Sequence, residues 1–479
     1  MSREFRCCPG TRLSFRNITF PFTSIPQYRF VMSLRKSCFA NALGECCPMK
    51  KVAQNVLLLL PLSGLAVRAS AQATPTATGQ PAYQGFQLPT IGGSLQYALS
   101  ASETITTGYN GNGGTAASTN LSGDIAYITT SERHPFSIVY TGGELISDNG
   151  NAPSSFFSDL ALSQVYKTRN WEFIGTDSVS YLPDSPTTGL SGVLGVGDLG
   201  SAPVTTSVGQ NILTNNNPRV DNSVSGSAIR TITGNTSVHA TGSYEVLRFL
   251  DDTTDAINSN QVGASVGVEH RLNQRNSVGA SYSYSSFTYE NGGFSFITQS
   301  VFVDYTRQWT RNLTMTAAIG PQRASSSASK TDASYFSPSV NVGGSLGLTY
   351  SGRLTTYSLL YLRSENGGSG IAQGALSDSI SFNARRPLNR VWAAAGTVLY
   401  NRSTSLPNLA ATSFSTSSEV ASGQLSRGIG RSLSAFLSYA VERQTEDGLS
   451  SSTAIYNGTS QIIGFGITYA PSHRPLARP

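Results

Sequence analysis

The chain has 479 residues and a formal net charge of +6, yet only 13% of its residues are charged. Ordinary soluble domains are about 25% charged, so the chain does not have the composition of a typical soluble domain. No apolar run reaches the roughly 20 residues of a transmembrane helix, which excludes a bundle of such helices. Regular apolar positions persist from about residue 93 to residue 470, which counts against a disordered or collagen-like chain.

The first segment, residues 1–48, has a composition of its own. It holds all five cysteines of the chain, including the adjacent pairs Cys7-Cys8 and Cys46-Cys47. Adjacent pairs lack the C-x-x-C spacing with which two thiolates bind one zinc ion, so no metal site is expected. We expect a disordered segment outside the folded unit, either a non-native extension ahead of a start at Met49 or an unusual leader.

Residues 49–71 have the three parts of a secretory signal peptide. Two lysines follow Met49, residues 56–62 are apolar, and Ala69-Ser70-Ala71 fits an A-x-A cleavage site, with a second frame at Ala71-Gln72-Ala73. The first 71 residues carry 10 of the 33 basic and 2 of the 27 acidic residues. The exported chain would therefore have a net charge of −2 and no basic stripe for nucleic acid.

Residues 72–92 contain Pro75, Pro81 and Pro89 and read as a periplasmic linker. Beyond them, apolar and polar residues alternate, which is typical of a strand with one apolar and one polar face. The pattern predicts eighteen strands, near 93–109, 120–131, 135–147, 157–168, 171–182, 221–233, 236–250, 258–272, 275–290, 294–308, 311–325, 337–350, 353–365, 376–386, 390–403, 413–427, 431–444 and 457–470.

The connections between these strands alternate between short and long. Short turns rich in Gly, Asn and Arg, such as 273–276 and 310–312, suit tight hairpins, and the longer connections are rich in Ser, Asn, Asp and Gly. This hairpin rhythm predicts an all-β fold over 93–470. The predicted fold is a single antiparallel up-and-down barrel of about 18 strands (16–18), and most of these strands are long enough to cross a bilayer.

The three tryptophans, Trp171, Trp309 and Trp392, all adjoin short turns. An amphipathic ring favours the headgroup level of a membrane, so these residues are expected to form an interface girdle. Aromatic packing in a soluble β-sandwich and a soluble β-helix are the alternatives. The confinement of Trp to one end and the signal peptide favour the membrane barrel.

The signal peptide, the alternating strands and the hairpin rhythm resemble the general porin class of bacterial outer-membrane β-barrels. The resemblance is architectural and rests on no specific motif. It implies the bacterial outer membrane as location, outer-membrane lipid and barrel-assembly machinery as partners, and a possible homo-oligomer. The chain departs from the pattern because the aromatic residues Phe465 and Tyr469 are followed by a tail, residues 471–479.

Strand alternation assigns side chains to the two faces of the barrel. The lipid face should carry Val266, Val268, Tyr282, Val303, Leu346, Leu348, Leu437 and Phe465. The opposite phase sends charged residues into the lumen, namely Asp124, Glu172, Glu245, Glu269, Asp304, Arg385 and Glu442. Such a wall would favour cations weakly. The alternative is that these charges pair with one another or lie at wet rims.

The longest connection, about 183–220, is the third outer loop, and the resemblance to porins implies that it narrows the pore. Its stretch 190–200 is apolar for an exposed loop, which favours burial in the lumen mouth. Asp184, Asp198 and Arg219 are its candidate constriction residues. Residues 195–200 also fit G-x-G-x-x-G, but no βαβ unit surrounds them, so no nucleotide site is expected.

No catalytic, cofactor or metal site is predicted, and the chain is not expected to be an enzyme. His134, His239 and His270 form no cluster in the sequence, and serine is too frequent for its proximity to indicate a triad. The predicted function is a porin-like channel for passive passage of small solutes or ions. The alternative is a non-conducting structural or export-associated barrel whose lumen is plugged by a loop.

Overall fold

The computed structural model describes residues 94–109, 114–129, 131, 133–148, 154–182, 218–250, 257–290, 295–326, 337–367, 374–406, 414–430, 432–447 and 457–470. The chain divides into two units, Met1–Gly64 and Leu65–Pro479, and every described residue belongs to the second. The predictions for residues 1–48, 49–71, 72–92 and 471–479 lie outside the described residues and stay predictions.

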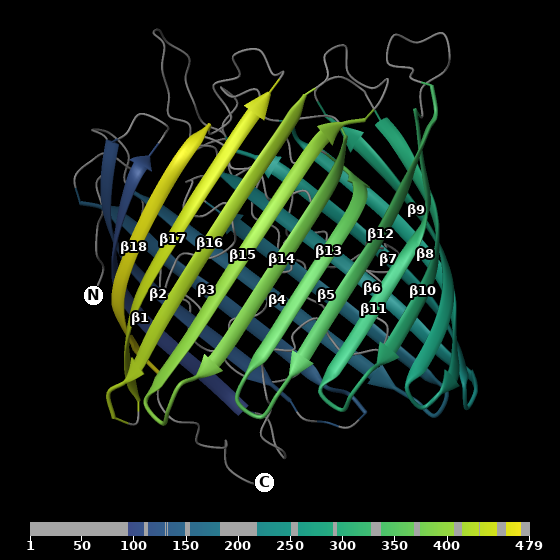
Figure 1. The fold of residues 1–479 in the computed structure, drawn as a ribbon, viewed down its shortest axis with the longest axis horizontal. Helices are drawn as coiled ribbons and strands as arrows, with labels where there is room; N and C mark the ends of the chain where they lie inside the picture. The colour runs from purple at the N-terminus through teal and green to yellow at the C-terminus, as the bar shows by residue number, and fades with distance from the viewer. Residues whose placement is uncertain are drawn as a thin grey trace, which may run out of the picture. The chain divides into compact units, whose positions relative to one another are not determined.

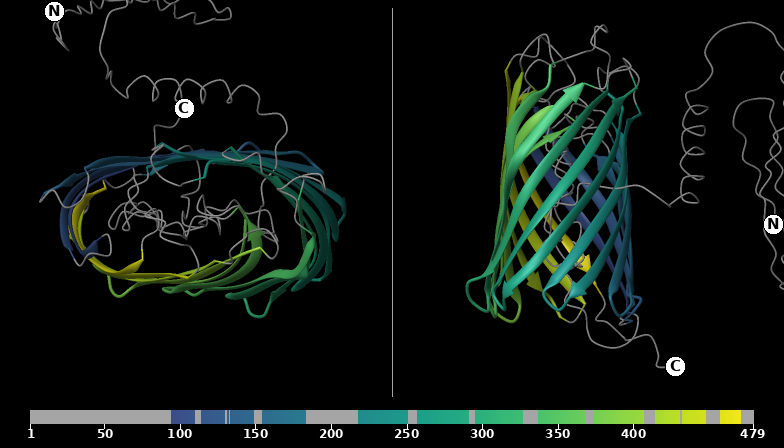
Figure 2. Two further views of the ribbon diagram at one scale, coloured as in Figure 1. Left: turned by 90° about the horizontal axis from the view of Figure 1, so that it is seen from above. Right: turned by 90° about the vertical axis from the view of Figure 1, so that its right-hand side faces the viewer.

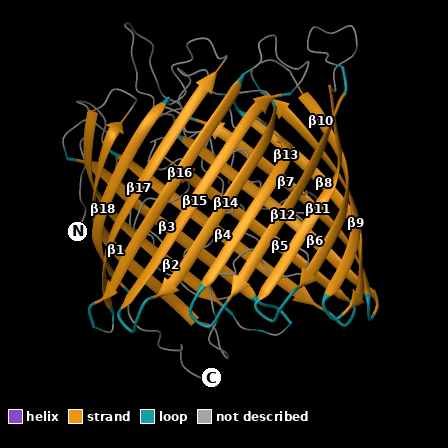
Figure 3. Cartoon of the chain, in the orientation of Figure 1, coloured by secondary structure: helices purple, strands orange, loops and turns teal. Residues whose placement is uncertain are grey.

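Eighteen antiparallel strands form one closed barrel, as the sequence predicts (Figure 1, Figure 3). In the described residues, no helix is long and apolar enough to cross a membrane. The strands are β1 Ser94–Tyr109, β2 Gly114–Ile128, β3 Phe136–Ser147, β4 Ser155–Lys167, β5 Trp171–Leu182, β6 Arg219–Thr233, β7 Thr236–Phe249, β8 Ser259–Asn273, β9 Asn276–Tyr289, β10 Ser295–Gln308, β11 Leu313–Ser326, β12 Ser339–Ser351, β13 Thr356–Asn366, β14 Ala375–Pro387, β15 Trp392–Ser405, β16 Ser415–Gly428, β17 Leu433–Asp447 and β18 Gly458–Tyr469.

Every strand pairs with its neighbours in sequence, and β1 also pairs with β18. The β1–β18 pairing runs from Leu99 opposite Tyr469 to Thr107 opposite Gln461. It removes both free edges of the sheet, which would otherwise be open to association. The ring of strands is oval when seen from above (Figure 2).

The predicted boundaries agree closely with the strands, and the largest shift is at the start of β2. This strand was predicted from residue 120 but begins at Gly114. Its first residues, Gly114-Thr115-Ala116-Ala117-Ser118, carry no apolar alternation. They are nevertheless held in the sheet, because their backbone pairs with β1 up to Tyr109 opposite Gly114.

The short turns share one kind of local hydrogen bonding, which explains their common composition. In the β8–β9 turn, the Asn273 Oδ1 atom accepts hydrogen bonds from the backbone amides of Arg275 and Asn276, at 2.9 and 3.0 Å. Asn389 does the same for the turn before β15. Thr310 uses its hydroxyl oxygen in the turn before β11. Short polar side chains are favoured in such turns because they satisfy otherwise unpaired amides.

The two faces of the wall differ as the alternation predicts. On β1, Leu99 and Ile105 are exposed on the outside, while Ser102 and Thr104 are buried on the inside. Seven of the eight residues predicted for the lipid face are exposed, and Leu348 is half-buried. An outer surface of exposed large apolar residues is the surface that a bilayer covers.

Candidate functional site: the lumen of the barrel

Cross-strand neighbours point to the same face of a sheet, so the register identifies the residues that line the lumen. One such row joins Asp159 on β4, Ser180 on β5 and Asp221 on β6. Adjacent strands lie about 4.8 Å apart, which places the two aspartates two strands apart on the inner wall. Glu245 on β7 shares this inward phase, because Asp221 lies opposite Leu247.

These three carboxylates form an acidic group near the long-loop end of the barrel. Asp221 interacts electrostatically with Asp159 and with Arg219, and Glu245 interacts with Asp221. Asp221 and Arg219 are buried, with 6% and 4% of their surfaces exposed. This part of the lumen therefore holds three carboxyl side chains and one guanidinium.

A second acidic group lies nearer the short-turn end. Glu269 on β8 and Asp304 on β10 both lie opposite Gly279 of β9. Asp304 accepts a hydrogen bond of 3.1 Å from the Ser281 hydroxyl and interacts electrostatically with Glu269 and His239. The His239 ring lies over Gly267, where a β-carbon would approach the ring to 2.5 Å. The absence of a side chain at Gly267 therefore makes room for the imidazole.

The other predicted lumen residues are spread over the wall. Asp124 on β2 and Glu442 on β17 face inward and are 3% exposed. Glu172 on β5 forms an ion pair of 3.1 Å with Lys167, so this charge is compensated. Arg385 on β14 faces inward near the short-turn end and is exposed.

The assignment of Arg219 to the third outer loop was wrong, because Arg219 is the first residue of β6. It pairs with Leu182 on β5 and Phe249 on β7, so backbone pairing extends the strand past the end of the apolar alternation. Asp184 and Asp198 lie outside the described residues, as does most of the predicted constriction loop.

The described residues show a different intrusion into the lumen, formed by the end of the β13–β14 hairpin. Pairing between β12 and β13 stops at Gly344 opposite Arg363, whereas β13 stays paired with β14 as far as Asn366 opposite Ala375. The hairpin end thus separates from β12 while β14 stays paired with β15 as far as Ala375 opposite Ser405, and it turns inside the ring in the view from above (Figure 2). We call residues 364–367 together with 374–376 the hairpin tip.

The hairpin tip packs against aromatic side chains of β9 and β10, which are not neighbours of β13 in the wall. The Tyr289 hydroxyl of β9 donates a 2.8 Å hydrogen bond to the backbone oxygen of Gly367. Leu376 belongs to a buried apolar cluster in which the rings of Phe287 and Phe296 stack at 4.5 Å. The remaining members of this cluster are Tyr289, Ala324 and Leu406.

Sequence reasoning missed the hairpin tip and several of the lumen acids, among them Asp159 and Asp221. Asp159 and Asp221 have the inward phase of their strands and were open to the same alternation argument as Glu245. The hairpin tip could have been inferred from the face on which the aromatic residues of β9 lie. Phe287 and Tyr289 point inward, whereas Tyr282 on the same strand points outward. Large buried aromatics on the polar face of a barrel strand indicate that something covers them.

The three tryptophans lie at the short-turn end on the outward face, where the girdle was predicted. Each carries an arginine over its ring: Arg230 on Trp171 at 5.2 Å, Arg307 on Trp309 at 4.5 Å and Arg427 on Trp392 at 5.4 Å. Two of these pairs are direct cross-strand neighbours, between β5 and β6 and between β15 and β16.

No protein-family model matches the chain. No curated protein matches it either. Among solved structures, it is similar to OccK2 (OpdF) of Pseudomonas aeruginosa, with a TM-score of 0.40, 13% identity, and coverage of 80% of this chain and 98% of that one. It is also similar to OccAB3 of Acinetobacter baumannii, with a TM-score of 0.39, 12% identity, and coverage of 79% of this chain and 99% of that one. Its similarity to the FrpB iron transporter of Neisseria meningitidis has a TM-score of 0.38 and 9% identity, and covers 76% of this chain and 63% of that one.

The class of the protein follows from the barrel itself. It has an even number of antiparallel strands, short turns at one end and long connections at the other, an apolar exterior and a polar interior. These are the features of bacterial outer-membrane barrels. The chain therefore has the architecture of a porin-like outer-membrane β-barrel.

Proposed function

We propose that the protein is a passive channel for small solutes or ions with a preference for cations. Barrels of sixteen to eighteen strands typically enclose an aqueous channel, which supports conduction. The preference rests on the inner wall. Its inward carboxylates among the described residues are Asp124, Asp159, Glu172, Asp221, Glu245, Glu269, Asp304, Glu365, Glu442 and Glu446, and its inward cations are Lys167, Arg219, Arg271 and Arg385.

The excess of carboxylates is the observation that carries the proposal. The wall's cations are fewer, and Lys167 is engaged with Glu172 and Arg219 with Asp221. A pore lined by charge of one sign accumulates counter-ions and excludes co-ions, because its low-dielectric walls focus the field.

Planar-bilayer recording of the purified chain tests both parts of the proposal. We expect stepwise conductance and, in a potassium chloride gradient, a reversal potential of the sign given by potassium-selective passage. A reversal potential of the opposite sign would contradict the cation preference. A complete lack of conductance would contradict the channel.

The alternative, a non-conducting structural or export-associated barrel, has one observation in its favour. The hairpin tip and its apolar cluster occupy part of the lumen near the long-loop end. We also propose that residues 183–220 narrow the lumen further. As partners we propose outer-membrane lipid and the barrel-assembly machinery, and a homo-oligomer is a possible assembly. Deletion of 190–200 should raise the conductance of an open form and leave a plugged form silent.

A further inference from the structure

The outward surface at the short-turn end is basic. The arginines that lie over the three tryptophan rings, Arg230, Arg307 and Arg427, are exposed, and none of them forms an ion pair with a described residue. Arg386 on β14 shares their outward phase. Six turns at this end each add an exposed arginine, namely Arg133, Arg169, Arg275, Arg311, Arg353 and Arg390. Within the described residues, this outward surface carries no carboxylate.

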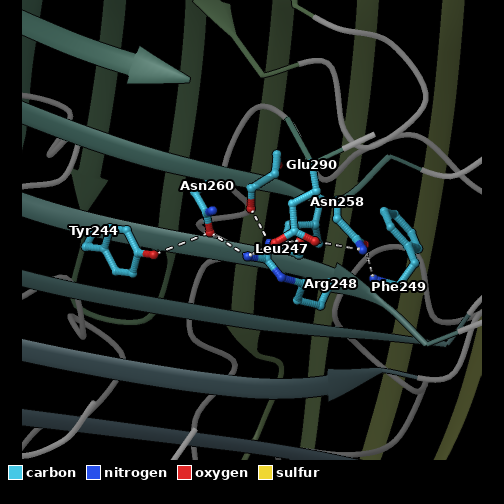
Figure 4. Close-up of polar contacts among 8 residues, drawn as sticks. Tyr244, Leu247, Arg248, Phe249, Asn258, Asn260 and Glu290 are labelled. Carbon is cyan, nitrogen blue, oxygen red and sulfur yellow. Dashed lines mark hydrogen bonds and ion pairs between the residues drawn. The ribbon is translucent and has the colours of Figure 1, made fainter. Parts of the chain in front are cut away.

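The opposite rim of the barrel shows that this is not a general property of the wall. Near the long-loop end, Arg248 forms an ion pair of 2.7 Å with Glu290 and donates a hydrogen bond to Asn260 (Figure 4). Arg363 forms an ion pair of 2.8 Å with Asp378 on the neighbouring strand. Arg443 lies directly opposite Glu419. Among the described residues, these three arginines near the long-loop end each lie beside a carboxylate, whereas the outward arginines at the short-turn rim do not.

We propose that the short-turn rim binds the phosphate groups of anionic phospholipids, phosphatidylglycerol in particular, in the inner leaflet of the membrane. The proposal rests on the barrel spanning the membrane and does not depend on conduction. Tryptophan rings favour the headgroup level, so the three pairs of arginine and tryptophan mark the depth at which lipid phosphates lie. The unbalanced positive charge at this depth calls for an anionic partner.

The geometry of the pairs suits this ligand. A guanidinium over an aromatic ring is held by its planar face, while its N–H donors lie along its edges. Those edge donors match two oxygens of one phosphate. The tryptophan therefore holds the arginine at the headgroup level and leaves its donors available.

Quenching of tryptophan fluorescence by brominated lipids measures binding at these very sites, because the chain has only three tryptophans and all belong to the pairs. The purified chain is reconstituted into mixtures of brominated phosphatidylglycerol with plain phosphatidylcholine, and into the reverse mixtures. A basic residue near the surface contributes about a fivefold preference for anionic lipid, so we expect phosphatidylglycerol to be favoured by about that factor. The preference should decline as salt rises.

The test variant carries Arg230→Gln, Arg307→Gln and Arg427→Gln, and its preference should fall toward one, with the remaining rim arginines accounting for any residual preference. The matched control carries Arg323→Gln, Arg402→Gln and Arg443→Gln, three outward, exposed arginines near the long-loop end. It should keep the wild-type preference. If the triple variant does not fold, the lipid preference is measured instead in the single variant Arg307→Gln and in the wild type at increasing salt concentration. Equal quenching by both lipids in the wild type, or an equal loss in the control, would overturn the proposal, whatever the conductance of the barrel.

Discussion

The hydroxyl of Tyr289 on β9 donates a hydrogen bond to the backbone oxygen of Gly367 at the end of β13, although three strands separate β9 from β13 in the wall. Along the wall, four steps of about 4.8 Å would keep these groups roughly 19 Å apart. The contact therefore exists because the hairpin tip crosses the lumen. Part of the lumen at this end is thus occupied by a segment held in part by one hydrogen bond, which the loss of a single oxygen atom would remove.

Tyr289→Phe removes this hydrogen bond and keeps the aromatic packing. Loss of a buried hydrogen bond costs about 0.5–1.5 kcal/mol, which is enough to raise the fraction of time that the tip spends away from β9. We expect single-channel records with larger or noisier current steps. Tyr361→Phe is the matched control, because its hydroxyl makes an equally short bond of 2.8 Å to Asp378 on the outward face. Equal effects of both variants would count against a lumen role for the tip.

Neutralising the acidic group near the long-loop end should weaken cation selectivity. Asp221→Asn with Glu245→Gln removes two inward carboxylates and keeps the shape of both side chains. The permeability ratio of potassium to chloride, taken from reversal potentials, should fall toward one because the pore then attracts fewer counter-ions. Glu144→Gln with Glu419→Gln removes two outward, exposed carboxylates and should leave the ratio unchanged. A fall in this control would mean that surface charge sets the ratio.

Val266→Arg tests the assignment of the lipid face. Val266 is exposed near the middle of β8, and an arginine at the midplane on the lipid side costs about 2–4 kcal/mol. The free energy of unfolding from vesicles, measured in urea, should fall by that amount. Ser265→Arg places the same charge one residue away on the inner face and should cost much less. If Ser265→Arg destabilised the barrel more than Val266→Arg, the inner and outer faces would be assigned the wrong way round.

Gly320→Ala should destabilise the barrel. A β-carbon at position 320 of β11 would collide with the backbone oxygen of Val301 on β10, and this oxygen cannot swing away as a side chain can. Overpacking of this kind costs about 1–3 kcal/mol, which urea unfolding can resolve. At Gly423 on β16 a β-carbon meets nothing within 4 Å. If Gly423→Ala destabilised the barrel as much as Gly320→Ala, the cost would come from backbone flexibility and not from the collision.

The strands could be predicted from the sequence because local chemistry determines them. The alternation from Val262 to Val268 and the turn at Asn273 place β8 and the following hairpin to within a residue or two. The alternation argument failed where pairing alone extends a strand, as at Gly114 and Arg219.

The lumen was predictable only in part, for a different reason. The phase of a strand assigns Glu245 and Asp304 to the inner face, but it does not say which inner residues meet. The approach of Gly367 to Tyr289 depends on the bending of a hairpin across a barrel whose width is set by all eighteen strands together. No window of the sequence contains that information.

The pairing of β1 with β18 separates the assembly of this barrel into two kinds of step. Sixteen strands have two partners that are adjacent to them in sequence, so their ladders can form hairpin by hairpin as the chain becomes available. The junction of Ser100 with Thr468, whose hydroxyls lie 3.0 Å apart, joins residues 368 positions apart in the chain. Such distant ends meet slowly, because the loop to be closed spans nearly the whole barrel. A chain interrupted before residue 458 would therefore keep its hairpins and still expose two unpaired edges. The last strand thus decides whether the other seventeen become a closed cylinder or an aggregation-prone ribbon.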